Sequence, residues 1–190
     1  MASSEHDRDS AASVVTGRDR LEALVRPFGG RVHCHSPADR PFSYAALART
    51  DDGRDRWGGP GLRSVYLASD PAVAIAEYAR HRDPAAPADR RRICAFRLGA
   101  VRLLDVRDDE AAQVLGVPLG PTAFLDRERA RRIGRAIRAA GLCQGLIVPS
   151  MAFLERPERF NIVLFVEQLD VDLERLLTDP EVVGEIRLDA

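Results

Sequence analysis

An arginine, a tyrosine and a glutamate between residues 56 and 81 could do chemistry together. Arg56 stands before glycines 58, 59 and 61, Tyr66 lies ten residues further on, and Glu77 lies in the next apolar segment. A guanidinium binds phosphate or carboxylate through paired N–H groups, and glycines let the backbone approach a ligand closely. If a turn, a strand and a helix bring the three together, they can hold an anion beside a carboxylate and a phenol.

Each of these residues also has a purely structural interpretation. Arg56 could belong to an ordinary surface loop, and Tyr66 could be a half-buried strand residue. Helical periodicity over residues 70–82 predicts a core stripe of Ala72, Ile75, Ala76 and Ala79, with Val73, Glu77, Arg80 and His81 on the opposite face. Glu77 is therefore expected either to line a cleft or to form a surface ion pair with its neighbours.

Other polar residues lie at the ends of predicted strands. Ser150 follows Val148-Pro149, where it could be a simple cap or a site residue. His33 and His35 share one face of a strand, but the sequence offers them no clear third and fourth metal ligand. We therefore expect no metal site and favour histidines that line a cleft. Three widely spaced cysteines do not suggest a disulfide framework.

The elements that must position these residues alternate between strand and helix patterns. We expect a disordered tail over residues 1–17 and one α+β domain over 18–190, with a central mixed β-sheet flanked by helices. Residues 37–60 are expected to form a long loop with one helical turn near 44–48, and 83–89 a linker. Expected helices cover 18–28, 70–82, 108–115, 126–140 and 171–177; expected strands cover 31–36, 64–68, 92–98, 101–106, 145–149, 160–166 and 182–188.

Two helices have clear boundary signals. Asp70-Pro71 is typical of a helix start, and Gly141 is typical of a helix end. The helix over 126–140 carries many arginines, which predict a solvated face: Arg127, Arg129, Arg131, Arg132, Arg135 and Arg138.

Composition narrows the classes of function. The chain has 190 residues, 45% of them hydrophobic and 30% charged, and a formal net charge of −1. The net charge near zero predicts no nucleic-acid partner, and the sequence has no run of about 18 apolar residues that could span a membrane. The N-terminal residues do not resemble a secretory signal, so we expect a cytoplasmic location. All basic residues other than histidine are arginines, because the chain contains no lysine. This excludes Schiff-base chemistry and the lysine of phosphate-binding loops.

Taken together, several motifs resemble the RES-domain family over about residues 25 to 170. The matches, in chain order, are Arg31-Val32, Arg56-Trp57 with Gly61, Tyr66-Leu67-Ala68, Glu77, Pro149-Ser150 and the strand Asn161–Phe165. Arg54-Asp55 replaces the glycine pair of the family pattern, and Gly58 stands where that pattern has asparagine.

The resemblance implies a fold similar to that of the ADP-ribosyltransferases and an NAD-degrading toxin of a RES–Xre toxin–antitoxin pair. Glu77 would stabilise the oxocarbenium-like ribose, and Tyr66 would pack on the nicotinamide. Arg56 and Arg31 would hold the NAD diphosphate or inorganic phosphate. Ser150 would orient nicotinamide or ribose, without acting as a nucleophile. The remaining residues expected to bind NAD are His33, Trp57 and Asn161.

Three functions stay open from the sequence. The first is an NAD phosphorylase or glycohydrolase, with phosphate as co-substrate in the former case. The second is a mono-ADP-ribosyltransferase that modifies a cellular protein. The third is an inactive NAD-binding module, suggested by the departures at Arg54-Asp55 and Gly58. The expected partners are an Xre-like antitoxin that covers the active site and a second copy of the chain, paired through apolar strand edges.

Overall fold

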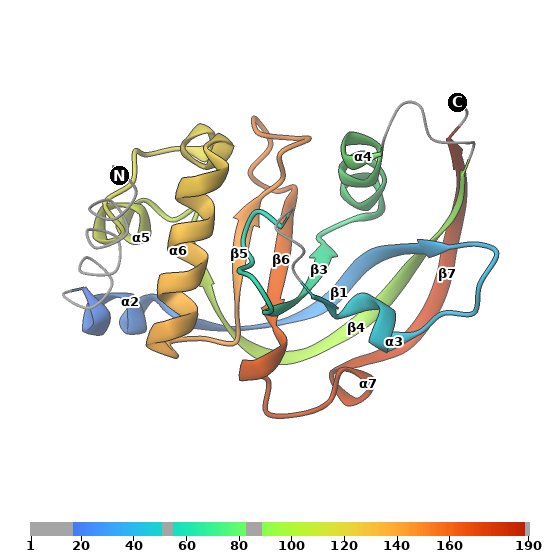
Figure 1. Ribbon diagram of the computed structural model, residues 1–190, viewed down its shortest axis with the longest axis horizontal. Helices are drawn as coiled ribbons and strands as arrows, with labels where there is room; N and C mark the ends of the chain where they lie inside the picture. The colour runs from blue at the N-terminus through green and yellow to red at the C-terminus, as the bar shows by residue number, and fades with distance from the viewer. Residues whose placement is uncertain (1–16, 51–54, 83–88, 189–190) are drawn as a thin grey trace.

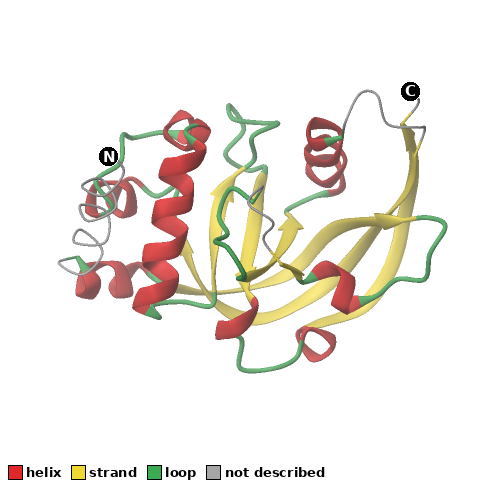
Figure 2. Cartoon of the chain, in the orientation of Figure 1, coloured by secondary structure: helices red, strands yellow, loops and turns green. Residues whose placement is uncertain are grey.

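The computed structural model describes residues 17–50, 55–82 and 89–188 (Figure 1). The tail predicted over residues 1–17 lies outside this part of the chain apart from Gly17, and the predicted linker over 83–89 lies outside it apart from Asp89. The described residues form one mixed sheet with helices around it, which confirms the predicted α+β class (Figure 2).

The sheet has seven strands, in the order β1-β3-β6-β5-β4-β7, with β2 paired to β3. It is mixed because β4 and β5 run parallel while the other pairs run antiparallel. The strands are β1 (Arg26–Pro37), β2 (Arg49–Thr50), β3 (Arg63–Ala68), β4 (Asp89–Asp105), β5 (Gly145–Pro149), β6 (Phe160–Phe165) and β7 (Leu177–Leu188).

The long strand β4 closes the sheet on itself. One edge of β4 pairs with β1 from Arg91 to Leu103, and its other edge pairs with β7 and then with β5. A further pair joins His33 of β1 to Ala68 of β3, so that β1, β3, β6, β5 and β4 form a ring. Apolar side chains from all five strands pack in one cluster, which includes Phe96, Ile162 and Leu164.

A second apolar cluster joins the other face of β3, β5 and β6 to three helices. These are α2 (Arg18–Leu24), α5 (Asp109–Val114) and α6 (Arg127–Ala140), which lie together on one side of the molecule in Figure 1. The shorter elements are α3 (Tyr44–Leu47), α7 (Leu173–Leu176) and the 3₁₀ turns η1 (Pro121–Leu125) and η2 (Val166–Gln168). Helix α4 (Pro71–His81) stands apart from this group, beyond β6 in the same view.

The predicted boundaries were wrong in three regions of the chain. The first helix ends at Leu24, because β1 already begins at Arg26. Gly29-Gly30 lies at an irregularity in the β1–β4 pairing, where Gly30 has φ 134°. The strands predicted over 92–98 and 101–106 are one strand, because β1 pairs with β4 on both sides of Gly99-Ala100. The helix predicted over 171–177 covers only Leu173–Leu176, and β7 begins directly after it.

The arginine-rich helix was also only partly predicted. Asp126 caps α6 by accepting a hydrogen bond from the N–H of Arg129 (3.0 Å), and Gly141 ends it in the left-handed conformation. Arg138 is buried rather than solvated: its guanidinium donates to Ser64 Oγ (2.6 Å) and stacks over Phe165. Sequence periodicity missed this because an arginine can be buried when its N–H groups find partners.

Candidate active site

Helix α4 carries Glu77 on the side that faces the protein. Asp70 caps the helix by accepting from the N–H of Val73 (3.1 Å), and Pro71 takes the first helical position, as predicted. The predicted core stripe was wrong, however, since Val73 is buried and Ala79 is exposed. Glu77 follows Val73 by one helical turn and therefore shares its inward face.

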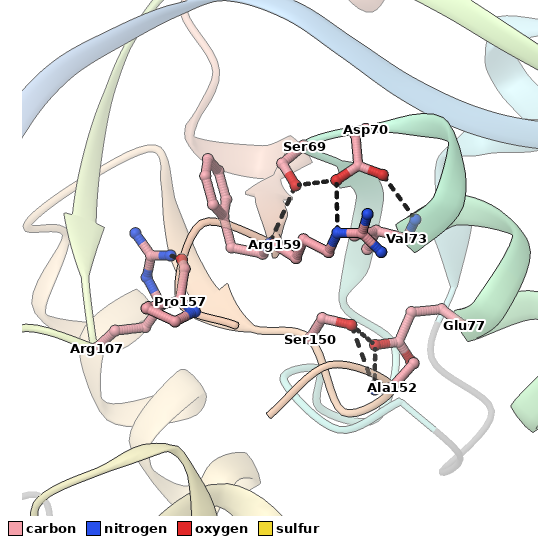
Figure 3. A network of polar contacts seen from close by, with 10 residues as sticks. Ser69, Asp70, Val73, Glu77, Arg107, Ser150, Ala152, Pro157 and Arg159 are labelled. Carbon is pink, nitrogen blue, oxygen red and sulfur yellow. Dashed lines mark hydrogen bonds and ion pairs between the residues drawn. The ribbon is translucent and has the colours of Figure 1, made fainter. Parts of the chain in front are cut away.

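The carboxylate of Glu77 is held by donors from β6 and from the loop that joins β5 to β6. Its Oε1 accepts from Ser150 Oγ (2.6 Å), from the N–H of Ala152 (3.2 Å) and from Asn161 Nδ2 (3.1 Å). Figure 3 shows Ser150 and Ala152 pointing at Glu77. Only 17% of the Glu77 side chain is exposed, and its Oε2 lies 4.0 Å from His81 Nε2. A surface ion pair therefore does not account for this residue.

The loop of residues 150–159 is fixed to the start of α4. Ser69 Oγ accepts from the N–H of Phe160 (3.0 Å), and Arg159 Nε lies 3.9 Å from Asp70 Oδ2 (Figure 3). Phe153 packs on the small cluster formed by Ala68, Val73 and Ala74. These contacts explain why Ser150, at the end of β5 and fully buried, meets a glutamate 73 residues away.

Arg56 contacts the 3₁₀ turn η1, which directly precedes α6. Its Nη1 donates to the carbonyl oxygens of Phe124 (2.6 Å) and Leu125 (3.1 Å) in η1. Burial lowers the pKa of Arg56, and the like charges of Arg127 and Arg80 lower it further, while Glu77 and Tyr66 oppose the shift. These interactions place the predicted arginine within electrostatic reach of the predicted carboxylate and phenol.

Tyr66 and Trp57 connect the glycine-rich turn, residues 56–61, to the sheet. The N–H of Trp57 donates to the Tyr66 hydroxyl (3.3 Å). The Trp57 side chain is only 2% exposed and packs on Phe124, with ring centroids 5.1 Å apart. Gly134 of α6 touches the Trp57 backbone so closely that an added Cβ would lie 2.6 Å from its carbonyl oxygen. The tryptophan predicted to bind NAD thus anchors the turn, and its indole is not open to a ligand.

Arg31 and His33 occupy β1, and no described contact joins them to Glu77. Arg31 forms an ion pair with Glu181 of β7 (2.6 Å), and 60% of its side chain is exposed. His33 is buried at the junction of β1 with β3; burial lowers its pKa, and the charge of Arg31 adds to this effect. Within the described residues, no group of three or more His, Cys, Asp or Glu side chains could hold a metal ion.

Sequence reasoning missed two features of the site. One is the backbone N–H of Ala152, and the other is the pair of arginines, Arg80 and Arg127, whose charges lower the pKa of Arg56 after burial. No sequence signal identifies a loop N–H as a donor to a distant carboxylate, because the contact depends on how the loop folds back. Arg80 and Arg127 were visible only as members of charged helices. His81 was visible as the i+4 neighbour of Glu77.

The described residues thus form an α+β domain in which Glu77 of α4 is held by Ser150 and Asn161, with Tyr66 on β3 and Arg56 in the turn before β3. The RES domain family matches residues 25–181, and the chain belongs to this family. No curated protein matches the chain. Within the described residues, no helix has both the length and the apolar character needed to cross a membrane.

A solved structure shares the fold. It is the crystal structure of the M. tuberculosis MbcT–MbcA toxin–antitoxin complex, with a TM-score of 0.64 and 17% sequence identity over 90% of this chain and 91% of the other. At this level of identity the similarity is one of fold.

Proposed function

We propose that the protein is an NAD-cleaving enzyme of toxin type that breaks the bond between nicotinamide and ribose. The observation that carries this proposal is the fixed carboxylate of Glu77 on the side of α4 that meets Ser150 and Asn161, within electrostatic reach of Arg56 and Tyr66. Membership of the RES domain family supports the substrate class.

Glu77 would act on the ribose. Its Oε1 is occupied by three donors, so Oε2 is the oxygen left to accept a hydrogen bond from a ribose hydroxyl. As the glycosidic bond breaks, its electron pair leaves with nicotinamide, which becomes neutral, and positive charge develops on the ribose. A fixed carboxylate close by stabilises that charge without reorganising during the reaction.

Ser150 would act through Glu77 rather than on the substrate. Its hydroxyl is buried and donates to the carboxylate, and no described histidine stands beside it as a base. This differs from the role in orienting nicotinamide or ribose that the resemblance implied. We propose that Ser150, Asn161 and the Ala152 N–H are positioning groups that fix the orientation of the carboxylate.

Tyr66 and Arg56 would bind the two charged parts of NAD. The half-buried ring of Tyr66 can pack on the cationic nicotinamide, a contact of about 0.5–2 kcal/mol. Arg56 is fixed by two carbonyl oxygens, which carry no formal charge, so its own charge remains available to a phosphate group. Arg31 keeps its predicted phosphate role only if it leaves Glu181.

The acceptor of the ADP-ribosyl group decides between the related activities. In phosphorolysis, a phosphate oxygen forms the new bond to the ribose and gives ADP-ribose-1''-phosphate; in hydrolysis, water forms that bond and a proton is released. A mono-ADP-ribosyltransferase would transfer the group to a protein side chain. We propose phosphorolysis, because the cationic surroundings of Arg56 favour an anionic acceptor.

A protein antitoxin is the proposed partner, and the cytoplasm the proposed place of action. The crystal structure that shares this fold contains a toxin–antitoxin complex, which supports a neutralising protein that covers the site. An Xre-like identity for that protein is part of the proposal.

The test is release of nicotinamide from NAD, with and without inorganic phosphate, by the wild type and by Glu77→Gln. Glutamine keeps the shape of the side chain and an oxygen that can accept from Ser150, so the fold should survive. We expect phosphate-dependent release by the wild type and a loss of about 10²–10³-fold in the variant. Equal turnover by the two proteins would remove Glu77 from its role, and labelling of a lysate by tagged NAD would favour a protein acceptor.

A further inference from the structure

Three arginines surround the candidate site with little negative charge to balance them. Arg56 comes from the glycine-rich turn, Arg80 from the end of α4 and Arg127 from the first turn of α6. Arg56 donates to the carbonyl oxygen of Leu125 (3.1 Å), two residues before Arg127, and Arg80 precedes His81, whose Nε2 lies 4.0 Å from Glu77 Oε2. Burial lowers the pKa of Arg56 and of His81, and the charges of the neighbouring arginines lower both further. Among the described residues, Glu77 is the one carboxylate that acts on both Arg56 and His81.

The acidic residues beside Arg127 are already engaged elsewhere. Asp126 caps α6 and lies 3.7 Å from Arg129 Nη2. Glu128 pairs with Arg131 at 3.0 Å. Arg127 therefore extends from the first turn of α6 without an acidic partner within the described part of the chain.

Arg80 is in a similar position. Glu77 lies three residues before it on α4. One of its carboxylate oxygens accepts from donors on β6 and on the loop between β5 and β6, and the other faces His81. Arg80 has no ion-pair partner among residues 17–50, 55–82 and 89–188. The side chains of Arg80 and Arg127 are exposed, so a ligand can reach both of them.

Unneutralised guanidinium groups repel one another, and an anion that bridges them removes that repulsion. A phosphate group has enough oxygen atoms to accept from several guanidinium groups at once, and arginine binds phosphate through paired N–H groups. The arrangement therefore selects phosphate over a single carboxylate. It also supplies the positive charge that Arg31, paired with Glu181, does not bring to this part of the molecule.

We propose that Arg80 and Arg127 form, with Arg56, a binding subsite for a phosphate group. The subsite rests on the proposed function for its biological ligand, which is either the diphosphate of the dinucleotide or inorganic phosphate as acceptor. Its existence as a phosphate site can be tested without turnover.

The experiment measures the binding of inorganic phosphate and of ADP by titration calorimetry at low ionic strength. The proteins are the wild type, Arg80→Gln, Arg127→Gln and the double variant. Arg63→Gln is the matched control, because Arg63 is an exposed arginine on β3 that does not act on Arg56. We expect each single variant to bind about tenfold more weakly and the control to bind like the wild type.

The two probes separate the two sources of phosphate. A loss for ADP alone assigns the subsite to the diphosphate, a loss for inorganic phosphate alone assigns it to the acceptor, and either result supports the proposal. A second readout is the pKa of His81 by NMR, which bound phosphate should raise in the wild type and not in the double variant. Unchanged melting temperatures would exclude misfolding as the cause of any loss.

The proposal fails if the wild type binds neither probe, if the double variant binds both as the wild type does, or if Arg63→Gln loses as much affinity. The proposed function fails separately. Arginine-dependent phosphate binding without release of nicotinamide from NAD would leave the subsite and remove the enzyme. Normal release of nicotinamide and normal KM values by the double variant would leave the enzyme and remove the subsite.

Discussion

The hydroxyl of Ser150 donates to Glu77 Oε1 at 2.6 Å, across 73 positions of sequence. Ser150 is fully buried at the end of β5, and Glu77 projects from α4 toward it (Figure 3). A hydrogen bond to a charged acceptor is stronger than one between neutral groups, and here it also fixes a rotamer. The serine therefore controls where the carboxylate points.

The first prediction concerns this bond. Ser150→Ala removes one of the three donors to Oε1 and leaves the Ala152 N–H and Asn161 in place. We expect kcat for nicotinamide release to fall about tenfold with little change in KM, because the carboxylate is less well oriented. Urea unfolding should show a loss of about 1–3 kcal/mol.

Ser150→Thr is the control for this prediction, since it retains a hydroxyl. Recovery of most of the activity by threonine would support the positioning role. A serine that acted as a nucleophile would instead leave a covalent ADP-ribosyl adduct in the wild type, detectable by mass spectrometry.

The second prediction concerns Arg56. Arg56→Lys keeps the positive charge but replaces the planar guanidinium that contacts the carbonyl oxygens of Phe124 and Leu125. We expect KM for NAD to rise about tenfold, while kcat changes less, because a lysine binds phosphate as a point charge. Steady-state kinetics measure both values. Arg102→Lys, on the exposed side of β4, should behave like the wild type.

The third prediction concerns the packing of α6 against the glycine-rich turn. In Gly134→Ala the new Cβ would lie 2.6 Å from the carbonyl oxygen of Trp57, so the turn that carries Arg56 must shift. We expect a loss of about 1–3 kcal/mol in the free energy of unfolding, together with weaker binding of NAD. Gly184→Ala on β7 is the matched control, because no atom lies within 4 Å of its added Cβ. Equal stability of the two variants would contradict the close contact.

The fourth prediction concerns the pH dependence of stability. Burial lowers the pKa of His33 below its ordinary value of 6.5, so the unfolded chain takes up a proton at a higher pH than the folded protein does. The free energy of unfolding should therefore fall as pH drops through 6.5 toward the lower pKa of the folded state. Above 6.5 the imidazole is neutral in both states, so His33 does not reduce the free energy of unfolding there.

Urea unfolding at several pH values between about 5 and 8 measures this slope. His33→Gln should flatten it, because glutamine does not titrate. His81→Gln should flatten it less, because 60% of the His81 side chain is exposed and solvent screens its charge. A slope that survives in His33→Gln would assign the acid sensitivity to another group.

Local signals in the sequence were sufficient for several elements. Asp70-Pro71 and Gly141 mark the start of α4 and the end of α6 because capping depends on residues a few positions apart. The order of the motifs around Arg56, Tyr66 and Glu77 was enough to indicate the family. The extent of β4 was not predictable, because a strand continues through Gly99-Ala100 only when a partner strand pairs with it.

The inward face of α4 was predicted wrongly for a related reason. Periodicity identified two stripes, one rich in alanine and one that contains Val73 and Glu77, but it could not say which stripe meets the sheet. The packing of Val73 on Ala68, with Phe153 against them, decided the question and turned the carboxylate of Glu77 toward Ser150.

The sequence by itself thus determined the residue types at the site, their order and the elements that carry them, because these follow from local propensity and spacing. Only the tertiary structure decided that Trp57 is packed away, that Arg31 pairs with Glu181, and that Arg80 and Arg127 lie near Arg56. These are packing, ion-pair and electrostatic relations between segments far apart in the chain. Their geometry depends on how strands close and loops fold back, which no local pattern encodes.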